Sequence, residues 1–114
     1  MNCVRNYPWY RGWHQEFSPE GLVMVGVHTP ETTTERDLSA LRRHVMSEEL
    51  KFPIVSDNNQ NTWNTWGNSM WPSVYLIDKK GRLRYWWYGE LDWKGAGGQK
   101  MMAEKIKELL AEEG

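Results

Sequence analysis

The chain has 114 residues and a formal net charge of −1, with 14 lysine plus arginine residues against 15 aspartate plus glutamate residues. This length predicts one domain, 1–114, with a single modest core. The charge is balanced and no block of one sign stands out, which argues against nucleic acid and anionic membrane surfaces as partners. The longest aliphatic run, Leu22–Val27, is far shorter than the roughly 20 residues that cross a bilayer, so we expect no membrane insertion.

The N-terminus carries no apolar stretch of the kind found in secretory signals, so the chain itself encodes no export. Its single cysteine, Cys3, excludes an intramolecular disulfide and any multi-cysteine zinc site. No two of the histidines, His14, His28 and His44, lie three or four residues apart, so we expect no metal site. We also expect no cofactor. His28 has no clustered partner, which favours a structural or solvent-facing role. Eight tryptophans in so short a chain must serve as core, interface or ligand surface.

The first predicted element is a helix from about Cys3 to Phe17, because Tyr10, Trp13 and Phe17 follow spacings of three and four. Pro8 falls inside it, where it removes a backbone donor and predicts a kink. The turn Ser18–Gly21 then ends the helix.

Leu22–His28 is continuously apolar and lacks alternation, which predicts an interior strand of a parallel sheet, covered on both faces. Thr32–Thr34 offer N-caps for a following helix that ends near Glu49. Its apolar face repeats every three or four residues: Leu38, Leu41 and Val45.

A second short strand is predicted at Phe52–Val55. Asp57–Asn59 follow it and start a helix that carries Trp63 and Trp66 and stops at Gly67.

The clearest hairpin pairs Ser73–Ile77 with Arg82–Tyr88 around the turn Asp78–Gly81. Leu83, Tyr85 and Trp87 are expected to share one face of its second arm. Since the neighbours Trp86, Trp87 and Tyr88 point to opposite faces, at least one large aromatic should face away from the core.

A glycine-rich loop, Glu90–Gly98, leads to a closing helix at Gln99–Glu112. Its inward-facing residues are Met102, Ile106, Leu109 and Leu110. The order of elements is therefore α/β, with a parallel portion and an antiparallel edge, and no strand precedes the first helix.

Several strings resemble one known family: Asn2–Pro8 (NCVRNYP), Gly21–Glu31, Phe52–Asn58, Thr62–Trp63 and Trp71–Asp78. Together, in this order and spacing, they resemble the thioredoxin-like redoxins of the TlpA and peroxiredoxin-related group. The similarity is greatest to the thioredoxin-like domain at the end of DipZ-type membrane thiol–disulfide proteins. Members of the group carry a first strand followed by Trp-x-x-x-Cys-x-Asn-Cys, so the match begins in the middle of the motif.

The resemblance implies a thioredoxin-like three-layer sandwich with a mixed sheet and a C-terminal antiparallel hairpin. The first central strand is absent, so the domain is N-terminally incomplete. Cys3 corresponds to the second, resolving cysteine, and Pro8 to the proline that kinks the first helix. Pro72 corresponds to the cis-proline beside the active-site cysteines, and Trp71 and Met70 are expected to bind substrate.

The absent strand would lie between Leu22–His28 and Ser73–Ile77, and its loss leaves two unpaired edges. A second copy of the chain could pair with these edges in a homo-oligomer. Alternatively, the chain is a piece of a longer protein that supplies the strand, or the two flanking strands pair directly with each other. The sequence leaves these three possibilities open.

Two functions remain open. One is a thiol–disulfide oxidoreductase-like domain that is impaired or works as a monothiol through Cys3, acting on protein or peptide thiols and disulfides. A helix N-terminus and Arg5 favour the thiolate of Cys3, whereas a buried position in the complete relatives favours an inert thiol. The alternative is a non-catalytic thioredoxin-fold module that binds a protein or peptide through an aromatic surface around Trp71, Trp86 and Trp93, although Trp71 equally suits core packing. The resemblance also implies an extracytoplasmic, periplasmic setting.

Overall fold

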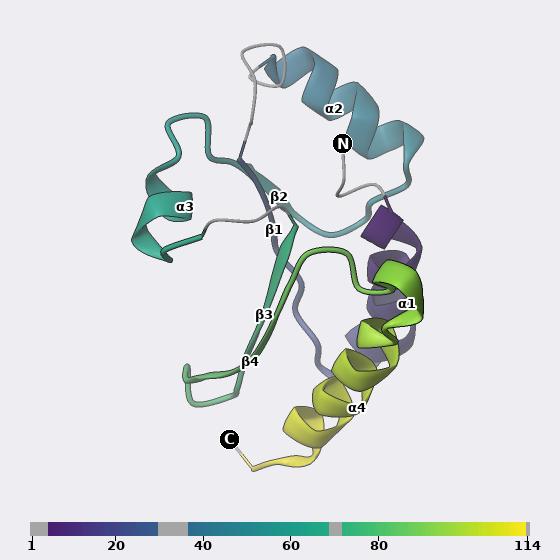
Figure 1. The fold of residues 1–114 in the computed structure, drawn as a ribbon. Helices are drawn as coiled ribbons and strands as arrows, with labels where there is room; N and C mark the ends of the chain where they lie inside the picture. The colour runs from purple at the N-terminus through teal and green to yellow at the C-terminus, as the bar shows by residue number, and fades with distance from the viewer. Residues whose placement is uncertain (1–4, 30–36, 69–71, 114) are drawn as a thin grey trace. The chain divides into compact units, whose positions relative to one another are not determined.

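The structure, a computed structural model, describes residues 5–29, 37–68 and 72–113. The chain divides into two compact units, the first comprising Met1–Leu22 with Met70–Gly114 and the second Val23–Ser69. Figure 1 traces their helices and strands along the chain. Each unit is described separately.

The first unit opens with α1, Tyr7–Phe17, which follows a 3₁₀ turn at Arg5–Asn6. Trp13 and Phe17 are buried, as the spacing of its aromatic residues predicts. Pro8 lies at the second residue of α1 and not inside the helix as predicted, so the reason for a kink there no longer applies. In the first turn the missing N–H of proline has no intrahelical acceptor to lose. A short 3₁₀ helix, η2, spans Ser18–Glu20 and ends α1 as predicted.

The hairpin forms as predicted, with β3 at Ser73–Ile77 antiparallel to β4 at Leu83–Tyr88. One detail differs, because an irregularity between Leu76 and Ile77 shifts the register. Leu76 lies opposite Tyr85, whereas Ile77 lies opposite Leu83, and directly opposed residues share a face of the sheet. Leu83 is therefore on the face of Ile77 and does not share the face of Tyr85 and Trp87.

Helix α4, Gly98–Ala111, contacts β4 and closes the core of the first unit. A short 3₁₀ helix, η4, spans Trp93–Gly95 in the preceding loop. Because Gly98 has no side chain, the start of α4 can pack closely against Leu91 and Trp87. A Cβ atom at this position would lie 2.5 Å from the carbonyl oxygen of Leu91 and 2.7 Å from the ring of Trp87. The buried apolar residues of this unit are Tyr7, Trp13, Phe17, Leu76, Leu91, Met102, Ile106 and Leu109. Of the four predicted core positions of the last helix, Leu110 is only half-buried.

In the second unit β1, Gly26–His28, pairs in parallel with β2, Ile54–Ser56. The parallel pairing is as predicted, but a strand of seven residues covered on both faces is not. Exposure alternates along 22–28, and Val23, Val25 and Val27 are exposed, Val23 by 82%. A strand with one covered face shows this alternation. Here one face is covered, so a continuous apolar run suggested more burial than the fold provides.

Helix α2, Leu38–Ser47, begins at Asp37, whose carboxylate accepts from the N–H groups of Ser39 (2.9 Å) and Ala40 (3.4 Å). Asp37 is therefore its N-cap, in place of the predicted threonines, which lie outside the described residues. Of the predicted apolar face, Leu38 is exposed and Leu41 and Val45 are half-buried. Helix α3, Asn61–Thr65, follows β2 as predicted and stops before Gly67, where φ is 67°.

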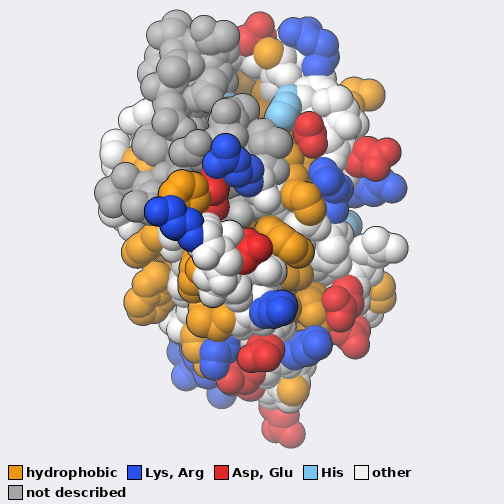
Figure 2. Space-filling model, turned by 45° about the vertical axis from the view of Figure 1, so that its right-hand side comes forward, with side chains coloured by type: hydrophobic (Ala, Val, Ile, Leu, Met, Phe, Trp, Pro, Cys, Tyr) orange, Lys and Arg blue, Asp and Glu red, His pale blue; other side chains and the backbone are white. Residues whose placement is uncertain are grey.

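The described strands form two separate two-stranded sheets, β1–β2 and β3–β4. Among the described residues, β1 and β3 therefore each have one strand neighbour, and direct pairing between them, one of the three possibilities left open by the sequence, is not part of this topology. None of the described helices combines the length and apolarity needed to span a membrane. On the face shown in Figure 2, lysine and arginine side chains are interspersed with aspartate and glutamate, without a field of one sign.

Candidate functional site

Of the four predicted site residues, Cys3, Met70 and Trp71 lie outside the described residues. Pro72 is described and is buried directly before β3. Its carbonyl oxygen accepts a hydrogen bond from the N–H of Gly89, the residue after β4, at 2.7 Å. The cis geometry expected at Pro72 stays a prediction, while its attachment to the end of β4 is a feature of the structure.

The start of α1, which follows Cys3 closely in the chain, is bound to the same stretch of backbone. Arg5 donates through Nη1 to Oε1 of Glu90 at 2.8 Å. The side-chain oxygen of Asn6 accepts from the N–H of Leu91 at 2.9 Å, and its amide nitrogen donates to the hydroxyl of Tyr10 at 3.0 Å. Asn6 and Leu91 are among the most deeply buried residues of the chain, with 1% and 0% of their surface exposed.

Three consecutive residues, Gly89–Leu91, thus contact both Pro72 and the Arg5–Asn6 turn that precedes α1. Sequence reasoning missed Asn6, Glu90 and Leu91 as site residues. The pairs Arg5–Glu90 and Asn6–Leu91 are each separated by 85 positions, and no local pattern links an asparagine at a helix start to the backbone of a distant loop. Arg5 and Asn6 did fall within the string Asn2–Pro8 that resembles the family.

The N-cap position of α1 is occupied by Asn6, a residue type that usually accepts hydrogen bonds from the first N–H groups of its own helix. Among the described residues no side chain caps α1 in this way. The oxygen of Asn6 is instead directed to Leu91. Asn6 therefore serves tertiary attachment of the helix start rather than local capping.

Asp57 is a second buried polar residue, in the other unit. It accepts from the hydroxyl of Thr29 at 2.9 Å and from the N–H groups of Thr62 at 3.1 Å and Trp63 at 3.0 Å. Burial alone would raise the pKa of Asp57, but these hydrogen bonds outweigh it and lower the pKa below its ordinary value. The carboxylate is saturated by local donors, so its role is to hold the start of α3 against β1.

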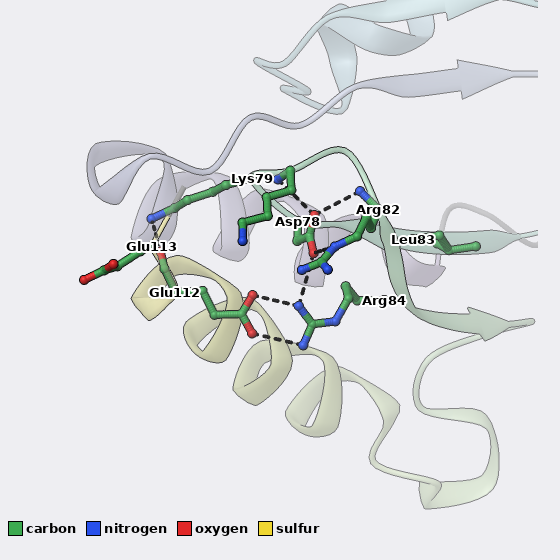
Figure 3. Close-up of a pocket in the computed structure, with 8 residues that line it drawn as sticks. Asp78, Lys79, Arg82, Leu83, Arg84, Glu112 and Glu113 are labelled. Carbon is green, nitrogen blue, oxygen red and sulfur yellow. Dashed lines mark hydrogen bonds and ion pairs between the residues drawn. The ribbon is translucent and has the colours of Figure 1, made fainter.

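A charged cavity lies at the turn of the hairpin, lined by residues of the turn, β4 and the end of α4 (Figure 3). Arg84 forms two hydrogen bonds to Glu112, at 2.7 and 3.0 Å, and a third to Asp78 at 3.1 Å. Hydrogen bonds from the backbone of Arg82, and then from the Arg84 and Arg82 side chains, hold the pKa of Asp78 far below its ordinary value despite burial. The ion pairs of Arg84 with Asp78 and Glu112 connect the hairpin to the end of α4. Because these charges are paired and the turn lies at the opposite end of β3 from Pro72, we assign this cavity a structural role and not substrate binding.

Exposed aromatic side chains form the last candidate. Trp86 and Tyr88 on β4 are about half exposed, as is Trp93 in the following loop. The ammonium of Lys94 lies 5.7 Å from the centre of the Trp93 ring. Trp87, between the two exposed aromatics, is half-buried and donates through Nε1 to the carbonyl of Glu90 at 3.2 Å. The prediction that at least one residue of this triplet faces away from the core is confirmed.

The described residues contain no group of three or more histidine, cysteine, aspartate or glutamate side chains placed to hold a metal ion.

Comparison with known families matches residues 1–86 to the AhpC/TSA family. The DipZ protein of Mycobacterium tuberculosis (strain CDC 1551 / Oshkosh) is 38% identical over 93 residues, which is 82% of this chain and 13% of DipZ. The thiol-disulfide oxidoreductase YkuV of Bacillus subtilis (strain 168) is 26% identical over 110 residues, covering 96% of this chain and 70% of YkuV. The chain thus spans only a small part of DipZ and most of YkuV.

Solved structures with a thioredoxin-like fold superpose on this one. A crystal structure described as a putative thiol:disulfide interchange protein DsbE from Chlorobium tepidum gives a TM-score of 0.82 at 16% identity, over 96% of this chain and 72% of that one. The solution structure of a thioredoxin-like protein in the oxidised form gives the same TM-score at 22% identity, over 97% of this chain and 70% of that one. These similarities confirm the predicted α/β class and thioredoxin-like fold.

Proposed function

We propose that this chain, which belongs to the AhpC/TSA family and has a thioredoxin-like fold, exchanges disulfides as a monothiol through Cys3. The observation that carries this proposal is the set of hydrogen bonds by which Gly89–Leu91 contact Pro72 and the Arg5–Asn6 turn before α1. It supports an arrangement in which the segment that follows Cys3 and the proposed cis-proline loop are held by one stretch of backbone. Trp71 and Met70 complete the proposed site as substrate contacts.

The chemistry proceeds in two balanced exchanges. The Cys3 thiolate attacks one sulfur of a protein, peptide or glutathione disulfide, and the other sulfur leaves as a thiolate. The mixed disulfide on Cys3 is then attacked by an external thiol, which releases Cys3 and becomes part of a new disulfide. The chain has one cysteine, so the second thiol comes from another molecule and turnover is slower than in a dithiol redoxin.

The test is mixed-disulfide formation with oxidised glutathione, followed by mass spectrometry, together with reduction of insulin in the presence of glutathione. The wild-type chain should gain one glutathione adduct and accelerate insulin reduction over the glutathione blank. Cys3→Ser should lose both. Equal behaviour of wild type and Cys3→Ser would contradict the proposal.

A second candidate function is a binding module without catalysis, favoured by the half-exposed Trp86 and Trp93. A protein or peptide partner would then bind in the same way to Cys3→Ser, and binding would be lost on Trp71→Ala. Binding that follows Cys3 and is indifferent to Trp71 would favour the first function.

In this proposal the chain assembles into a homo-oligomer that completes the sheet in place of the first strand. It also has an extracytoplasmic location, by similarity to the family it resembles. Fractionation of cells that produce the native protein would test the location, with recovery in the cytosol as the contradicting result.

A further inference from the structure

We propose that a groove in the second unit, between α2 and β2, binds an anionic amphiphile, a molecule with a linear alkyl chain and one carboxylate head. The groove has a volume of about 500 Å³. Its apolar lining consists of Leu38, Leu41, Val45 and Met46 of α2 together with Phe52 and Ile54. Its polar lining is Arg42 and Ser56. None of these residues belongs to the site proposed for disulfide exchange, so the inference goes beyond that function.

Helix α2 supplies one wall of the groove as two rows of side chains, each with a spacing of four residues. Leu41 and Val45 form one row and are half-buried. Leu38, Arg42 and Met46 form the other row, and all three are exposed. Residues four apart lie one above the other on a helix, so the guanidinium of the groove has an apolar neighbour on either side.

Phe52 and Ile54 supply the other wall, and Gly26 of β1 makes room for them. Gly26 lies opposite Ile54 in the parallel register of β1 and β2. A Cβ atom at Gly26 would lie 2.5 Å from Cδ1 of Ile54 and 3.3 Å from Cε2 of Phe52. The two side chains therefore occupy the space that a side chain at Gly26 would take, and they give this wall an apolar surface.

The charge of the groove selects the head group of the ligand. Arg42 forms no ion pair within the described part of the chain, and none of the described lining residues is acidic. The carboxylate of Asp37, which precedes Leu38, is occupied as the N-cap of α2 and accepts from the N–H of Ser39 at 2.9 Å. A guanidinium pairs with a carboxylate through two parallel hydrogen bonds. The groove is therefore complementary to a single carboxylate.

The scarcity of polar side chains selects the rest of the ligand. A bound peptide brings several backbone N–H and C=O groups, each of which needs a partner once it leaves water. Apart from Arg42, the described lining offers only the hydroxyl of Ser56 as a polar side-chain group. An alkyl chain has no polar atoms to satisfy and gains free energy when apolar surface leaves water. Apolar grooves of this volume with few polar groups are typical of small-molecule sites.

Isothermal titration calorimetry of the full chain tests the head group. Dodecanoate is titrated below its critical micelle concentration, and dodecyltrimethylammonium serves as a probe with the same chain length and the opposite charge. The wild-type chain should bind dodecanoate about tenfold more tightly than the cation. Arg42→Gln should remove this preference by weakening dodecanoate binding about tenfold. Arg43→Gln, the same change at an exposed arginine outside the groove, should leave both affinities unchanged.

Chain length and a second variant test the apolar walls. From octanoate to dodecanoate, each added methylene should tighten binding by up to about fourfold. Leu38→Glu places a carboxylate one turn from Arg42 and should weaken dodecanoate binding severalfold. An acidic residue is favoured in the first turn of a helix, so this variant should fold as the wild type does, which far-ultraviolet circular dichroism checks.

Three results would overturn the proposal: no binding of dodecanoate, equal affinities of the wild type for the two probes, or equal effects of Arg42→Gln and Arg43→Gln. An affinity that does not change with chain length would also overturn it. So would an oligomer that sedimentation shows to be weakened by Met46→Arg, because a second copy of the chain would then occupy the groove.

Discussion

Asp57 illustrates how a single side chain organises its surroundings in this fold. Its carboxylate receives the N–H groups of Thr62 and Trp63 at the start of α3 and the hydroxyl of Thr29 after β1. Asp57→Ala removes all three acceptor contacts and should lower the free energy of unfolding by about 1–2 kcal/mol. Urea unfolding measures this, with the exposed neighbour Asn59→Ala as the control. A loss no larger than that of the control would contradict the capping role.

The two buried aspartates also predict how stability depends on pH. Hydrogen bonds outweigh burial and lower the pKa of Asp57, and hydrogen bonds led by the backbone of Arg82 lower the pKa of Asp78. A carboxyl group whose folded pKa is lowered contributes stability above its unfolded pKa, about 3.9, and loses it as the pH falls toward the folded value. Unfolding midpoints in urea should therefore be flat near neutrality and fall below about pH 4. Replacement of both residues by asparagine should flatten the acid limb, and an unchanged limb would exclude them as its cause.

At the scale of elements, the end of α4 is attached to the hairpin by charge. Lys79 donates through Nζ to the carbonyl oxygens of Leu110 and Glu112, at 2.9 and 2.8 Å. These carbonyls lie at the negative end of the helix dipole, where a cation stabilises the last turn by about 0.3–1 kcal/mol. Lys79→Met should speed amide exchange in the last turn of α4. Lys80→Met, an exposed lysine of the same turn, is the matched control and should not do so.

Contact between β4 and α4 depends on the absence of a side chain at Gly98. A Cβ atom there would meet the carbonyl of Leu91 at 2.5 Å and the ring of Trp87 at 2.7 Å. Gly98→Ala should therefore destabilise the chain by about 1–3 kcal/mol, because neither the backbone nor a packed indole moves without cost. Gly12→Ala in α1, where nothing lies within 4 Å, should be neutral or stabilising by about 0.5–1 kcal/mol. The thermal unfolding midpoints of the two variants measure this difference. Equal changes in the two midpoints would contradict the close packing of the start of α4 against Leu91 and Trp87.

At the scale of the whole molecule, the β3–β4 sheet retains a face that the described residues do not bury. The register shift brings Leu83 to the side of Ile77, and the exposed apolar side chains of the two strands are Ile77, Leu83, Trp86 and Tyr88. Such a patch suits association with another chain. Sedimentation should detect a concentration-dependent oligomer that Trp86→Arg weakens by about tenfold or more. Met46→Arg, at an exposed methionine of α2, is the control, and a wild-type chain that is strictly monomeric would contradict the prediction.

Local patterns in the sequence predict the type and order of most elements, and its motif strings predict the family. Periodicity placed α1, α2, α4 and the β3–β4 hairpin correctly, because local propensity and alternation act within a few residues. The motif strings predicted the redoxin fold. Their order along the chain was the informative feature, since each string alone is weak.

Burial, strand register and the contacts of the Arg5–Asn6 turn follow from the tertiary structure and not from local patterns. Whether the valines of 22–28 are exposed depends on what covers the strand. The face on which Leu83 lies depends on the register shift, and the place of Pro8 depends on where α1 begins. The same holds for Arg5 and Asn6, which form hydrogen bonds with residues 85 positions away. Contacts between distant residues form only when the chain has folded, so no local pattern contains them.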